Sequence, residues 1–101
     1  MVVFGHTVAK EEVVAYLNSP EIHDSAGVEK AQFDEKLPRL LIIEVNVEWF
    51  KLAPPLRLSL AKKWHEIWRH SVPEGIVSII DKDSGVAVVS FRPDGRVDLT
   101  K

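Results

Sequence analysis

The strongest pattern of hydrophobic and polar positions in this chain lies in residues 54–72 and is typical of an amphipathic helix. Pro54-Pro55 suits a first helical turn, where a missing N–H costs nothing, and Pro73 ends the helix. A start at Ser59, acting as the N-cap, is the alternative. At helical spacing one side gathers the apolar residues, which are Leu60, Trp64, Ile67 and Trp68, joined by Ser71 and bordered by Leu56 and Ala61. This side is predicted to face the core.

Alternating patterns predict strands on both sides of this helix. Residues 39–50 place positions 41, 43, 45, 47 and 49 on one face at period two, and this face is expected to be buried. The opposite face begins apolar and ends acidic, which favours a central strand whose second half emerges toward solvent. After the helix, residues 76–80, 86–91 and 96–99 are predicted to form a meander with turns at 81–85 and 92–95.

The first 38 residues give weaker signals. We predict a short strand at 2–4, a helix at 8–17 with Thr7 as N-cap, and a turn at 20–25. Residues 28–36 fit a short helix or a polar loop equally well. The expected fold is one α+β domain over residues 1–101, with a mostly antiparallel sheet of about four to five strands and two or three helices on one face. A ferredoxin-like strand order is possible.

Charge is distributed unevenly along the chain. The net charge is -2, but residues 51–72 carry five positive and one negative residue, whereas residues 11–50 carry three positive and nine negative residues. The chain has no cysteine, which excludes disulfides and thiolate chemistry. It has no basic leader followed by a long apolar run and no apolar stretch near the ~20 residues of a membrane span. A cytoplasmic protein without membrane contact is therefore expected.

No catalytic or cofactor motif is found. His65 and His70 are five residues apart, whereas two metal ligands on one helix face need a spacing of four. The segment 81–85 resembles the start of a calcium loop but lacks its glycine and glutamate spacing, so a hairpin turn is favoured. Serine nucleophile motifs and phosphate-binding glycine loops are absent. We predict no cofactor and no metal, and an enzyme is not favoured.

The polar side of the helix is the candidate interaction surface. It carries a stripe at helical spacing that we predict to be exposed, formed by Leu58, Lys62, His65 and Arg69. The three tryptophans are predicted to meet in the core. The favoured function is a non-catalytic protein-interaction or regulatory module that binds a second copy of itself, as a homodimer, or an acidic protein. The alternatives are a small enzyme or ligand-binding protein with a pocket between helix and sheet, and nucleic-acid binding through the basic helix face, which the acidic balance disfavours.

Overall fold

The computed structural model describes residues 9–91 and 97–99, with side chains described up to Phe91. Along the chain the elements are α1 (Lys10–Leu17), α2 (Pro20–Ala26), β1 (Val28–Asp34), β2 (Leu37–Val45), α3 (Val47–Lys51), α4 (Pro54–Ser71), β3 (Ile76–Asp81), β4 (Ala87–Phe91) and β5 (Val97–Leu99). The predicted strand at 2–4, the Thr7 cap and the turn at 92–95 lie outside the described residues.

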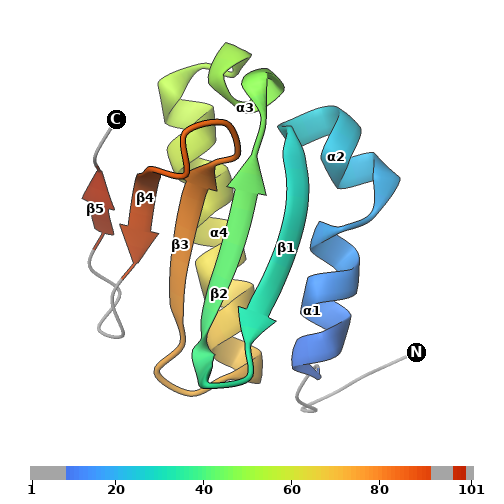
Figure 1. Ribbon diagram of the computed structural model, residues 1–101, viewed down its shortest axis with the longest axis vertical. Helices are drawn as coiled ribbons and strands as arrows, with labels where there is room; N and C mark the ends of the chain where they lie inside the picture. Colours follow the sequence, from blue (N-terminus) through green and yellow to red (C-terminus); the bar gives the residue numbers. More distant parts are fainter. Residues whose placement is uncertain (1–8, 92–96, 100–101) are drawn as a thin grey trace.

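The strands form one five-stranded sheet in the order β1-β2-β3-β4-β5 (Figure 1). β2 and β3 are parallel, and the other three neighbouring pairs are antiparallel. The parallel pair needs a crossover connection, which α3 and α4 provide, and α4 lies behind the sheet in Figure 1. The predicted α+β class with a mostly antiparallel sheet is confirmed. The order is not ferredoxin-like, because β2 and β3 are direct neighbours with no strand between them.

The predicted central helix is confirmed, including its start at Pro54 rather than Ser59. Trp64 and Trp68 are fully buried against the alternate residues of β2 and β3 that face the same side. Trp68 also donates a hydrogen bond from Nε1 to the carbonyl of Arg39 at 2.8 Å, which ties α4 to the beginning of β2. The three tryptophans share one core, in which the rings of Trp49 and Trp64 pack against each other at an interplanar angle of 32°, with 5.5 Å between their centroids.

The prediction of a helix or loop at 28–36 was wrong, since Val28–Asp34 is a strand. The pairing of β1 with β2 shifts by one residue between Val28 and Lys30. This bulge places Val28 and Ala31, three residues apart, in the core. A spacing of three is a helical signal, so the bulge hid the period-two pattern of the strand.

The strand predicted for 39–50 ends early. Leu41, Ile43 and Val45 are buried as predicted, but the chain then turns into α3. Asn46 begins that helix, because its side chain accepts a hydrogen bond from the N–H of Glu48 at 2.9 Å. Val47 is consequently 60% exposed, whereas Trp49 reaches the core from the helix instead of from the strand.

Two further corrections concern the N-terminal part. Residues 20–25, predicted as a turn, belong to α2, which has Pro20 in its first turn and Gly27 in the left-handed conformation at its end. α1 begins at Lys10 rather than at residue 8. Of its large hydrophobic residues, Val13 and Leu17 are buried and Tyr16 is exposed.

Gly27 marks the point where the α2–β1 turn crosses the beginning of α3. Its φ is 76°, and a Cβ placed there would collide with the backbone nitrogen of Trp49. Gly85 has a similar φ of 72° but open space around it. The two glycines thus separate the cost of the backbone conformation from the cost of the collision.

We predict that Gly27→Ala destabilises the fold much more than Gly85→Ala. The Gly85 change should cost about 1–2 kcal/mol, the penalty of the left-handed region for a residue with a Cβ. The Gly27 change should cost several kcal/mol in total, because backbone of α3 must also move. Urea unfolding followed by tryptophan fluorescence measures both, and equal losses would contradict the crossing described here.

Candidate interaction surface

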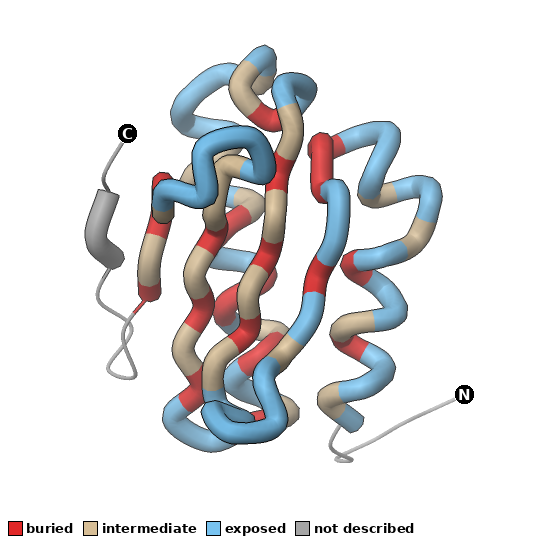
Figure 2. The backbone as a smooth tube through the Cα atoms, in the orientation of Figure 1, coloured by how far each residue is buried: buried red, intermediate tan, exposed pale blue. Residues whose placement is uncertain are grey.

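One face of the sheet is open. α4 covers the side that carries Leu41, Ile43, Val77 and Ile79, all buried. The alternate side chains of β2 and β3 point to the other side, over which no helix of the described residues lies (Figure 1). In Figure 2 these strands alternate between buried and half-buried positions. The half-buried residues are Leu40, Ile42, Glu44, Ile76, Ser78 and Ile80.

The register of the strands arranges these side chains in rows. The middle row joins Gln32 on β1, Ile42 on β2, Ser78 on β3 and Ser90 on β4. The row toward the ends of β2 and β3 joins Lys30, Glu44, Ile80 and Ala87, and the row toward their beginnings joins Leu40 and Ile76. We call this surface the open face. Its two central strands carry four large aliphatic side chains, so it is apolar in the middle and polar toward β1 and β4.

The edge formed by β1 is closed to a further strand. The side chain of Asn18, just after α1, accepts a hydrogen bond from the N–H of Ala31 at 2.8 Å and donates one to its carbonyl at 2.9 Å. These two bonds resemble those of a neighbouring strand. They occupy the N–H and the carbonyl of Ala31, with which an added strand would pair. The last strand of the described sheet, β5, has only three residues. Within the described residues, the β1 edge is therefore partly occupied by Asn18, whereas no helix covers the open face.

The predicted stripe on α4 is interrupted. Lys62 and Arg69 are exposed and Leu58 is half-buried, but His65 is only 4% exposed, so its assignment to an exposed surface was wrong. The reason is tertiary, because β4 extends the covered face of the sheet beneath this side of α4. The ring of His65 stacks on Phe91 of β4 with 4.5 Å between centroids. The solvent-exposed face of α4 is therefore narrower than the distribution of polar residues along the helix predicts, because His65 is polar but buried.

His65 is held in its buried position by a hydrogen bond. Its Nε2–H donates to the carbonyl of Gly75 at 3.1 Å, which links α4 to the turn before β3. Burial lowers the pKa of His65 below that of a free histidine, against a smaller opposing effect of the Gly75 carbonyl. The imidazole is therefore a neutral structural group that joins the helix to two strands.

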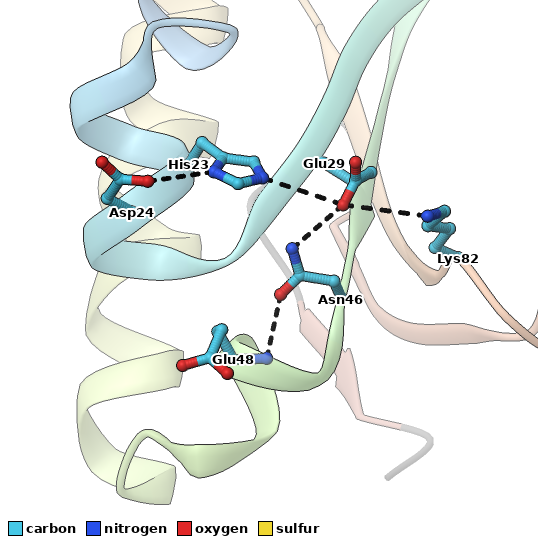
Figure 3. A network of polar contacts seen from close by, with 6 residues as sticks. All are labelled: His23, Asp24, Glu29, Asn46, Glu48 and Lys82. Carbon is cyan, nitrogen blue, oxygen red and sulfur yellow. Dashed lines mark hydrogen bonds and ion pairs between the residues drawn. The ribbon is translucent and has the colours of Figure 1, made fainter.

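A network of polar side chains lies at the end of the sheet where β2 and β3 finish (Figure 3). Asn46 Nδ2 donates to Glu29 Oε1 at 3.0 Å, and the same oxygen lies 3.8 Å from His23 Nε2 and 3.9 Å from Lys82 Nζ. The Asn46 bond and the nearby Lys82 lower the pKa of Glu29. The network connects α2, β1, α3 and the β3–β4 loop.

This network is solvent-exposed and is best explained as a clasp. His23 and Lys82 are about half exposed. Within residues 9–91 no three histidine, aspartate or glutamate side chains gather to hold a metal ion. One hollow, of about 400 Å³, lies elsewhere, beside the β1–β2 turn.

In the described part of the chain, none of the helices has the length and apolar character needed to cross a membrane. Comparison with protein-family models, with curated proteins and with solved structures gives no match. The case for a function therefore comes from the geometry of this chain alone.

His65 predicts a pH dependence of stability. A histidine in the unfolded chain has a pKa near about 6.5. Because the pKa of His65 is lower in the fold, the unfolded chain binds the proton first as the pH falls. The stability contributed by the neutral ring is complete above pH ~6.5 and decreases below it. His65→Gln should therefore lose less stability than the native protein between pH 7 and 5.

His70→Gln is the matched control, since His70 is exposed on the same helix. Urea unfolding at a series of pH values measures the three proteins. The His70 variant should follow the native pH profile, and a His65 variant that also follows it would contradict the buried neutral imidazole.

Proposed function

We propose that this chain is a non-catalytic protein-interaction module that forms a homodimer through its open face. The main support for the proposal is that both sides of the parallel strands β2 and β3 are apolar, whereas a helix covers only one side. Parallel strands are normally covered on both faces and have continuous apolar sequences. β2 contains Leu40–Ile43 and β3 contains Ile76–Ile80, both nearly continuous, yet α4 covers only one side. A second layer on the open face would satisfy this pattern.

A second copy of this chain is the occupant that the charges favour. The open face carries Lys30 toward one end of β1 and a carboxylate, Glu44, on the neighbouring strand. A partner with a single sign of charge would repel one of these groups, whereas an identical face offers both signs. The closed edge at Asn18 supports face-to-face contact over the addition of a strand. Isologous contact of this kind is the commonest arrangement of homodimers.

The size of the face indicates a reversible dimer. Four strands about 4.8 Å apart, with about six residues each rising about 3.3 Å, give roughly 400 Å² in projection. A standard interface buries about 800 Å² of accessible surface on each partner. This face alone is therefore smaller than a standard interface, so we expect a weak dimer that exchanges with the monomer.

Ile42→Glu tests the proposal, because Ile42 stands in the middle row of the open face. The native protein should be a dimer at high concentration by light scattering coupled to gel filtration. Ile42→Glu should be a monomer with an unchanged circular dichroism spectrum, since its side chain points to the uncovered side. The control is the double change Lys62→Glu/Arg69→Glu on the exposed side of α4, which should leave the dimer intact.

The same measurement separates the two candidate surfaces. If the α4 variant loses the dimer and Ile42→Glu keeps it, the dimer interface lies on α4 and not on the open face. A native protein that stays monomeric up to millimolar concentration would exclude the homodimer.

A further inference from the structure

The positions of charged side chains on the open face would also determine how two copies are oriented relative to each other. We infer that the twofold axis of the dimer runs along the middle row, so that Lys30 of one copy faces Asp34 of the partner subunit. The inference rests on the proposed homodimer and specifies its geometry. It names the two residues, on a single strand, that decide how the copies align.

The argument begins with the pattern of β1. Ala31 and Phe33 turn toward the helices, because Ala31 is buried and the ring of Phe33 packs at a tilt against Trp68 of α4, with 6.1 Å between centroids. Lys30 and Gln32 therefore point to the open face. Asp34 is two residues beyond Gln32 on the same strand, so it points to the same side. β1 thus presents a cation, an amide and a carboxylate in sequence.

These charges lie symmetrically about the middle row. Along a strand, two residues correspond to about 7 Å, so Lys30 and Asp34 stand at similar distances on opposite sides of Gln32. A twofold axis along the row exchanges the two ends of the face. It brings Lys30 over Asp34 of the partner subunit and repeats the contact on the other side, giving two equivalent ion pairs.

The positions of the aliphatic side chains are compatible with the same twofold axis. It places Ile80 over Ile76 of the partner subunit and Ile42 over its own counterpart, so three of the four large aliphatic side chains meet aliphatic ones, while the fourth, Leu40, faces Glu44 of the partner subunit. Ser78 and Ser90 lie on the axis, where a small hydroxyl side chain allows close approach. An axis parallel to the strands, between β2 and β3, would also place Glu44 over an aliphatic side chain, Ile80, but it would place Lys30 over Ala87 and leave this cation without a facing carboxylate.

Both charges are available for a partner. Neither Lys30 nor Asp34 takes part in an ion pair with another of the described residues. The hydrogen bond recorded for Asp34 Oδ1 is the one it accepts from the N–H of Lys36, at 2.7 Å, within the β1–β2 turn. Glu44 is the registered neighbour of Lys30. In the dimer each Lys30 would lie between Glu44 of its own chain and Asp34 of the partner subunit, so every carboxylate on the face has a cation nearby.

Charge reversal tests this geometry without any other ligand. Lys30→Asp alone and Asp34→Lys alone should each weaken the homodimer by about tenfold or more, because both pairs become repulsive. An equimolar mixture of these two variants should form a heterodimer of near-native affinity, since each contact again joins opposite charges. The double variant Lys30→Asp/Asp34→Lys should recover the homodimer. Analytical ultracentrifugation gives the dissociation constants.

Two controls protect the test. Lys63→Asp reverses an exposed charge on α4 and should not change the dimer. Asp34→Asn keeps an acceptor for the Lys36 N–H, so it removes the charge without removing the bond of the turn, and it should weaken the dimer less than Asp34→Lys does. Circular dichroism confirms that each variant is folded.

The outcomes distinguish this inference from the proposed function. A native dimer that is unaffected by both single reversals would overturn the axis and leave the homodimer standing. Single reversals that weaken the dimer without recovery in the mixture or in the double variant would also overturn the axis. A native monomer would overturn both.

Discussion

The packing of α4 on the parallel pair β2–β3 is the contact on which the rest of the structure depends. Trp64 and Trp68 fill the space between helix and sheet, and Trp68 is fastened to the beginning of β2 through the carbonyl of Arg39. The turn that follows α4 is equally constrained. A Cβ at Gly75 would lie 2.6 Å from the ring of Trp68, and the Gly75 carbonyl accepts the hydrogen bond from His65. One helix thus fixes the register of both central strands.

This arrangement also creates the surface that we assign to function. A crossover helix can cover only one side of the strands that it connects, and α1 packs on that same side, against β1 and α4. No helix of the described residues covers the aliphatic residues on the other side of β2 and β3, and in the proposed homodimer they would pack against the second copy. The polar residues of the outer strands then limit which partner fits. The clasp around Glu29 and the bonds of Asn18 to Ala31 rigidify the ends and edge of the sheet, so the face offered is a stable one.

Residues with strong and regular signals were predicted correctly. The helix from Pro54, the apolar side formed by Trp64 and Trp68, and the strands near Ile79 and Val89 follow from spacing alone. The predictions were wrong where a β-bulge or a helix cap interrupts the regular spacing of apolar residues. The bulge after Val28 imitated a helix, and the Asn46 cap ended a strand within an alternating sequence. The bulge depends on how β1 pairs with β2, which is distant in the sequence. The end of β2 depends on one side-chain cap, that of Asn46.

The candidate surface was harder to predict than the fold. The chain by itself determined the elements, their apolar sides and the existence of apolar runs in β2 and β3, because periodicity is a local property. Only the tertiary structure decided which side of those strands is covered and that β4 extends the sheet beneath His65. A sequence states how many apolar residues need burial, but the connections between elements determine which of them the chain can bury within itself.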